Sequence, residues 1–449
     1  MVKQFFIFLL CLCLPLCAFT EGEKLTLEEV RSLALANSRS LAKYNMTVRT
    51  STLDEKTQTY AGLPSLSAGV SASTELWSAE GVPRTPLKDS FRAGASFGVS
   101  QNLWDGGKNS LLRQINALST ESARQDALAE YYVVLNASDA AYYGVLEGTE
   151  NLTAAENALE TAALSLSIAE VRYESRMISD AEYLQALAEK ESKENARNQA
   201  RQTLVLSKLK LRNLTGLSGL PELEAVDFEN HETLIQTLAG LDDGGTLRLY
   251  DLLWKQISVK NPALVKAIVN TGKAEKNLSL AARDYSPTLS ASLSTGLNYT
   301  LENGLKFSSG SFSLSGRIPL DFWVTAANVE KRQIAKEQAA LDYLSAGESL
   351  DMELQTALLD IIFRAGQVLS SRRALDYGQR HFEYVMELFR LSRNSLSDLY
   401  DAGAVVLSSQ NQLNQARYGF LLGISKIRGL GLFESEADIA ALVSEALDA

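Results

Sequence analysis

Apolar and polar residues alternate strictly in two stretches of the chain, residues 66–104 and 289–320. In the first stretch, Leu66 and Val70 share one face of the predicted strand, and Ser67 lies on the other. A period of two is typical of a β-strand with one apolar and one polar face. Each stretch has room for two strands and a loop. The pattern therefore predicts two separate pairs of strands.

Helical spacing of apolar residues accompanies each strand pair. Thr26 and Glu29 form a capping-box pattern, which predicts a helix from there to about Tyr60. A much longer helix is predicted from Asp105 to about Tyr173, roughly 100 Å at about 1.5 Å per residue. Helices of this length are typical of coiled-coil packing rather than of compact domains. A second helix, over residues 179–213, completes a hairpin whose turn lies near residues 173–178.

The second half of the chain repeats the first. Pro64-Ser65-Leu66-Ser67 is matched 223 residues later by Pro287-Thr288-Leu289-Ser290, and Asp105 is matched 216 residues later by Asp321. After Pro319, another helical hairpin is predicted to extend to about Leu430. Recurrence of strands and hairpin in the same order indicates an internal duplication.

The duplication divides the chain into successive segments. They are a signal peptide at residues 1–20, a first repeat of helix, two strands and long hairpin at 21–216, a linker with little regular structure at 217–246, a second repeat at 247–430 and a tail at 431–449. The apolar run after Lys3 is typical of a secretory signal. It contains Cys11, Cys13 and Cys17, all the cysteines of the chain. Lipid modification of Cys17 is the alternative to simple cleavage, and the bulky Leu16 before it favours cleavage.

Composition excludes several classes of function. The formal net charge of -11 argues against nucleic acid as a partner. His231 and His381 are the only histidines, and no HExxH motif, nucleophile elbow or phosphate-binding loop is present. We therefore expect neither an enzyme nor a bound cofactor or metal. No apolar run after residue 20 is long enough for a helical membrane span.

Strands of about 10–14 residues suit a membrane barrel, in which an open sheet edge is forbidden because unpaired backbone groups are costly. Four strands per chain cannot close a barrel, so the sheet must be shared between chains. Two chains would give about eight strands with a filled interior, and three would give about twelve with room for an aqueous bore. Four aromatic residues near strand ends suit an interfacial belt: Trp77, Trp104, Tyr299 and Trp323. A soluble sandwich with serine-rich outer faces is the alternative.

Several segments, in order, resemble the TolC-like outer-membrane efflux proteins (outer membrane factors). These are Leu63–Ser67, Leu103–Lys108, Arg172–Ser175, Asn261–Leu264 and Ser397–Ala402. The resemblance covers nearly the whole chain after the signal peptide. It implies an α+β membrane protein, a homotrimer with a 12-stranded β-barrel in the lipid of the bacterial outer membrane. The barrel would continue as a long α-helical coiled-coil barrel through the periplasm. The implied partners are a periplasmic adaptor protein and an inner-membrane transporter.

The resemblance also assigns roles at the two hairpin turns. The family's aperture carboxylates fall on Asp398 and Asp401, with Glu182 as the counterpart of Asp398 in the first repeat. Three copies of a carboxylate around an axis would form a negative ring that favours cations. The alternative is that these carboxylates belong to a solvated helix face. The tips implied to contact the adaptor are Tyr173, Arg176, Ser179, Ser392, Asn394 and Ser395. Arg176 and Ser392 occupy positions where the family has glycine, which admits positive φ.

The sequence thus favours a passive export duct of a tripartite efflux or type I secretion system. A coiled-coil structural or adhesive protein of the cell surface is the alternative. The exported substrate is not indicated, because a tunnel wall need not bind what passes through it.

Overall fold

A computed structural model describes residues 24–74, 91–300, 304–307, 310–391, 393–433 and 435–448. The expected signal peptide lies outside these residues. The chain divides into two units. Unit 1 comprises Met1–Arg39, Tyr131–Ile257 and Met352–Ala449, and unit 2 comprises Ser40–Glu130 and Ser258–Asp351.

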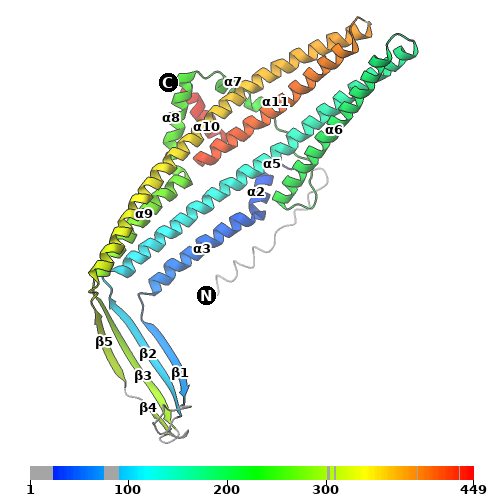
Figure 1. Cartoon of the computed structure of the whole chain (residues 1–449). Helices are drawn as coiled ribbons and strands as arrows, with labels where there is room; N and C mark the ends of the chain where they lie inside the picture. Colours follow the sequence, from blue (N-terminus) through cyan, green and yellow to red (C-terminus); the bar gives the residue numbers. More distant parts are fainter. Residues whose placement is uncertain are drawn as a thin grey trace. The chain divides into compact units, whose positions relative to one another are not determined.

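Unit 2 contains one antiparallel sheet (Figure 1). Its strands are β1 (Ser65–Ser73), β2 (Arg92–Trp104), β3 (Thr288–Thr300), β4 (Gly304–Phe307) and β5 (Ser311–Arg317). β1 pairs with β2, and β2 pairs with β3. Both β4 and β5 pair with β3, so together they occupy the place expected for a fourth strand. The predicted strand pairs are therefore present, and they join into a single sheet.

The helix predicted from Thr26 to about Tyr60 is two helices, α2 (Leu27–Asn37) and α3 (Arg39–Tyr60). The capping box of Thr26 and Glu29 is present as expected. The break lies at Ser38, whose backbone is extended. Asn37 donates hydrogen bonds to the carbonyls of residues 213 and 214, which ties the end of α2 to the end of another helix. That tertiary contact is invisible in the helical periodicity.

The long helical hairpins have the predicted bounds to within a few residues. α5 (Lys108–Glu174) has 67 residues and is followed by α6 (Asp180–Thr215). α10 (Phe322–Arg390) has 69 residues and is followed by α11 (Leu396–Gly431). Among the described residues, none of these or the other helices is long and apolar enough to cross a bilayer. α9 (Pro262–Ala282) belongs to unit 2 and begins at an Asn261 cap with proline at the first turn.

The expectation of little regular structure in residues 217–246 was wrong. A short 3-10 helix, η1 (Phe228–His231), leads into α7 (Glu232–Ala239), and α8 (Asp243–Lys260) begins soon after. Ile235 and Leu238 of α7 are buried, and α7 contacts α12 (Glu436–Asp448) of the expected tail. The glycines and acidic residues of this segment suggested a linker, but a few apolar positions are enough to fold it against a neighbouring helix.

Unit 1 also contains a buried ion pair. The guanidinium of Arg31 in α2 donates to both carboxylate oxygens of Asp139 in α5, each at 2.7 Å. Asp139 is 2% exposed and also accepts a hydrogen bond from Ser425 of α11. Asp139 thus joins α2, α5 and α11 at one point, through the bidentate pair with Arg31 and the hydrogen bond from Ser425.

Candidate functional site

The strand register places the large apolar side chains of the paired residues on one face of the sheet. Leu66 lies opposite Val99, Val99 opposite Leu293, and Leu293 opposite Phe312. Directly opposed residues share a face, so this row crosses the sheet from β1 to β5. Parallel rows continue the pattern, as in Val70, Ala95, Leu297 and Phe307.

The opposite face is polar, and most of its side chains are small. Ser65, Ser100, Ser292 and Ser313 form one row across the sheet. The hydroxyls of Ser65 and Ser100 lie 2.6 Å apart, and those of Ser292 and Ser313 lie 3.3 Å apart. Cross-strand serine pairs make this face polar and compatible with water.

No described element of the chain covers the apolar face. Leu66 is 81% exposed, Val70 90% and Phe307 85%. Within the described residues, β1 pairs with β2 alone, and β4 and β5 pair with β3 alone, so the sheet has two open edges. A large exposed apolar face is stable when an apolar medium covers it, and unpaired strand edges are stable when further strands pair with them.

The aromatic residues expected near strand ends lie on exposed surface where the structure describes them. Trp104 is the last residue of β2, and Tyr299 is the last but one of β3, so the two lie at opposite ends of this antiparallel pair. Trp323 is the second residue of α10. Trp77 lies outside the described residues. A bulge between Asn102 and Trp104 brings Trp104 opposite Leu289, onto the apolar face. Simple alternation would have placed Trp104 on the polar face.

The turn between α5 and α6 has the hydrogen bonds of a Schellman motif. The N–H of Met177 donates to the carbonyl of Arg172, and the N–H of Arg176 donates to the carbonyl of Tyr173. Arg176 has a φ of 57°, so this position requires the left-handed conformation that glycine adopts most easily. Arg176 stands where the family has glycine, and its backbone is therefore strained. The corresponding Ser392 lies outside the described residues.

Both hairpins open their second helix with a capping box. Ser179 and Glu182 cap α6, and Ser395 and Asp398 cap α11. The hydrogen bonds to Ser179 lower the pKa of Glu182, and those to Ser395 lower the pKa of Asp398. Their charged forms are therefore favoured in the fold, and this contribution is lost only as the pH falls through the lowered pKa. Glu182 and Asp398 have a structural role that the sequence analysis did not assign.

The predicted carboxylates are exposed. Asp398 and Asp401 lie three residues apart on the first turns of α11, so they share one helix face. Asn394 precedes the cap and is partly buried. Tyr173 stacks on Tyr183 with ring centres 4.6 Å apart, which joins the end of α5 to the start of α6. In the described chain, no cluster of histidine, cysteine or acidic residues could hold a metal ion.

A buried apolar cluster joins the two hairpins just behind their turns. Its members come from all four long helices: Ala169, Ala186, Val385, Phe389, Leu396, Leu399 and Ala402. Arg172 spans the same contact, because its side chain reaches the backbone carbonyl of Phe389. The turns were predicted from the sequence, but the role of Phe389 was not, because periodicity marks Phe389 only as one of many apolar helix positions.

Known proteins resemble this chain over most of its length. The family model described as outer membrane efflux protein matches residues 30–217 and 253–421. The outer membrane protein TolC of Salmonella enteritidis is 21% identical over 369 residues, which is 79% of this chain and 72% of TolC.

Solved structures show the same fold. CusC has a TM-score of 0.75 and 17% identity, covering 90% of this chain and 91% of CusC. The outer membrane channel CmeC of Campylobacter jejuni has a TM-score of 0.73 and 18% identity, covering 94% of this chain and 89% of CmeC.

Proposed function

The chain belongs to the outer membrane efflux protein family, and we propose that three copies form a passive export duct. The protein is located in the bacterial outer membrane, with its helical part in the periplasm. The open sheet of unit 2 is the observation that carries the proposal, because none of the described residues covers its apolar face or pairs with its two edges.

Three chains are the smallest number that suits this sheet. Each chain contributes four strand positions, and three chains give twelve strands with a water-filled interior. The serine and glycine rows would then line the bore, and the apolar rows would face lipid. Leu66, Val70 and Phe307 would lose their contact with water without any further protein domain.

The internal duplication expected from the sequence would supply the helical part of the duct. α5 and α6 correspond to α10 and α11, with similar lengths and the same capping box at each turn. The family model also matches two separate segments, one in each half. Three chains would supply six such hairpins, and these would form the wall of a tunnel of packed helices.

At the tunnel end, we propose that the hairpin turns meet a periplasmic adaptor and an inner-membrane transporter that supplies the energy. Asp398 and Asp401 are exposed near these turns, and three copies of each would form negative rings. Glu182 would add a third set from the first repeat. Efflux of small molecules and type I secretion of proteins both fit this architecture.

Single-channel recording of the purified protein in planar bilayers tests the function. The account predicts cation-preferring current with discrete steps. A protein that inserts no channel into bilayers, yet is exposed to added protease on intact cells, would instead be a surface adhesin.

A further inference from the structure

Every charged residue in the described strands of the sheet is positive. Arg92 is the first residue of β2, Lys306 lies in β4 and Arg317 is the last residue of β5, and all three are exposed. In the register they lie opposite polar residues of β3, namely Thr300, Asn298 and Thr288. They therefore share the polar face, and the described strands contain no aspartate or glutamate. This face is thus cationic in a chain with a formal net charge of -11.

Two of the three cations lie close together, at the end of the sheet where β4 follows β3. Arg92 and Lys306 stand on opposite sides of β3, because Arg92 is opposite Thr300 and Lys306 is opposite Asn298. The usual spacings of strands and of residues place their Cα atoms about 12 Å apart. Both side chains are long and flexible, so both charges can reach one extended anion. Arg317 lies at the other end of β3, about 33 Å along the strand from Lys306.

The surface between these two cations suits a bound anion. Asn298 and Thr300 of β3 lie between them, and their amide and hydroxyl groups can donate hydrogen bonds. Gly94 lies opposite Asn298, and Gly304 lies opposite Thr300, so glycines occupy the two remaining corners. Glycine within a strand often marks a place where a ligand approaches the backbone closely. We call these six residues the loop-end patch: Arg92, Gly94, Asn298, Thr300, Gly304 and Lys306.

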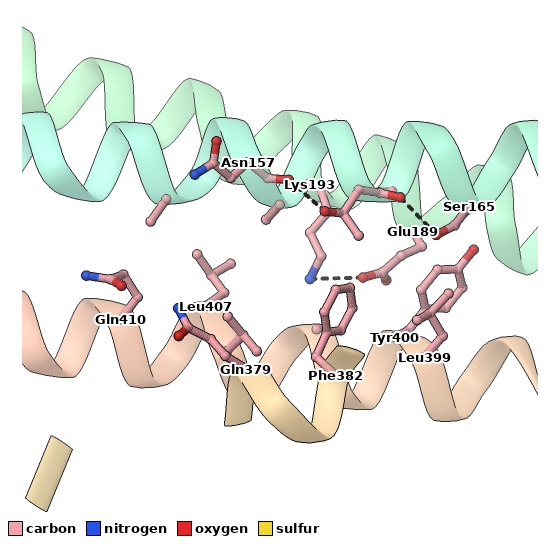
Figure 2. A pocket seen from close by; sticks show the side chains of 16 residues that line it. Asn157, Ser165, Glu189, Lys193, Gln379, Phe382, Leu399, Tyr400, Leu407 and Gln410 are labelled. Atoms are coloured by element: carbon pink, nitrogen blue, oxygen red, sulfur yellow. Dashed lines mark hydrogen bonds and ion pairs between the residues drawn. The ribbon is translucent and has the colours of Figure 1, made fainter. Parts of the chain in front are cut away.

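Cations of the helical unit are neutralised by carboxylates of the same chain. In the cavity between the two hairpins, Lys193 forms an ion pair of 2.9 Å with Glu189 (Figure 2). Arg31 is likewise paired with Asp139. Arg92, by contrast, forms no ion pair with a described residue. Its charge is therefore available to a ligand.

Three copies of the loop-end patch would form a ring. In the proposed barrel the polar face lines the bore, so three Arg92 and three Lys306 side chains would surround the axis. Rings of arginine and lysine are typical of pores for anions and phosphates, and a channel lined by one sign of charge concentrates the opposite ion. We propose that this ring binds soluble anions that carry two or more phosphate groups. The inference rests on the proposed trimer, and the barrel would keep lipid on its other face.

Equilibrium dialysis of radiolabelled inorganic tripolyphosphate against the protein in neutral detergent at low salt tests the proposal. We expect tripolyphosphate to bind at least tenfold more tightly than orthophosphate, because only the longer anion reaches both cations. High salt should release it, since the contacts are between charges exposed to water. Equal binding of the two anions would overturn the proposal.

Charge variants locate the binding. Arg92→Gln and Lys306→Gln each remove one cation and should each weaken tripolyphosphate binding about tenfold. Lys306→Arg keeps the charge and should bind as the wild type does. Two matched controls also remove one exposed cation: Arg317→Gln at the other end of the sheet and Lys255→Gln in α8. If the controls weaken binding as much as Arg92→Gln does, the net charge attracts the anion, and the loop-end patch is not its site.

Native mass spectrometry of the same samples separates this inference from the proposed function. A protein that is not a trimer would overturn both, because no ring could then form. A trimer that conducts in planar bilayers would leave the duct intact. If that trimer binds tripolyphosphate no more tightly than its Arg92→Gln, Lys306→Gln double variant, the anion site alone is overturned. The expected result is a trimer whose binding is lost in the double variant and kept in Lys255→Gln.

Discussion

The guanidinium of Arg172 in α5 donates a hydrogen bond of 2.6 Å to the backbone carbonyl of Phe389 in α10 and lies 4.3 Å from the centre of its ring. One side chain thereby connects the ends of two helices, through residues that are 217 positions apart in the sequence. The carbonyl belongs to the last turn of α10, where a helix leaves carbonyls without partners in its own backbone. Arg172 thus satisfies an acceptor and adds a cation–π contact at the same place.

We predict that Arg172→Met loosens both hairpin ends. Loss of a charged hydrogen bond and of the ring contact should lower local stability by about 1–2 kcal/mol, after allowance for partial exposure. Hydrogen exchange of residues 168–178 and 385–391 should accelerate about tenfold. Arg390→Met is the matched control, because Arg390 forms its ion pair with Glu387 on its own helix. Equal acceleration in both variants would contradict a specific role for Arg172.

Arg176→Gly should stabilise the first turn. Arg176 has a φ of 57°, and relief of its left-handed strain should outweigh the greater freedom of glycine in the unfolded chain by about 0.5–1 kcal/mol. Slower hydrogen exchange at the N–H of Met177, which closes the turn, measures the gain. Ser175→Gly, one residue earlier and without positive φ, should destabilise slightly. Faster exchange in Arg176→Gly would show that the arginine side chain contributes more than its backbone costs.

The aperture proposal predicts that Asp398→Asn with Asp401→Asn weakens block by divalent cations at least tenfold in planar bilayers, since two negative rings disappear. Because Asp398 also caps α11, Ser395→Ala is the necessary control. It removes the cap partner and keeps the charges, so cation block should persist. If Ser395→Ala weakens the block as much as the charge variants do, the carboxylate acts through the cap and not through a ring.

Asp139→Ala should be among the most damaging single changes in unit 1. It leaves Arg31 buried without its bidentate partner, at a cost of about 3–5 kcal/mol. Asp126→Ala breaks the more exposed ion pair with Lys266 and should cost less than about 1 kcal/mol. The denaturant concentration at the midpoint of unfolding measures the loss of stability in each variant. An Asp139→Ala midpoint as close to wild type as that of Asp126→Ala would mean that Arg31 reaches water or another partner.

Periodicity was sufficient to predict the strands and long helices, because their apolar patterns continue over many residues. The sequence-based predictions failed where local contacts in the fold decide the structure. The break at Ser38 depends on Asn37 reaching the end of α6, and the order of η1 and α7 depends on contact with α12. The orientation of Trp104 depends on a single bulge. None of these leaves a repeating signal in the sequence.

The candidate site divides in the same way. The turn near residues 173–178 followed from helical periodicity, and the roles of Asp398 and Asp401 were implied by the family resemblance. The capping role of Asp398 was also open to prediction, because Ser395 stands three residues before it, as Thr26 stands before Glu29. The contact between Arg172 and Phe389 could not be predicted from the sequence, because only the fold brings the two hairpins together.

The number of chains that close the sheet tests the central claim most directly. Native mass spectrometry of the protein extracted from outer membranes in detergent should give three times the mass of the mature chain. The trimer should dissociate when the unpaired edge of β1 can no longer pair with another strand, for example in the variant Val70→Pro. A dimer, or a monomer that is released by urea without detergent, would contradict the account, because the apolar face and the sheet edges would then have to be covered in another way.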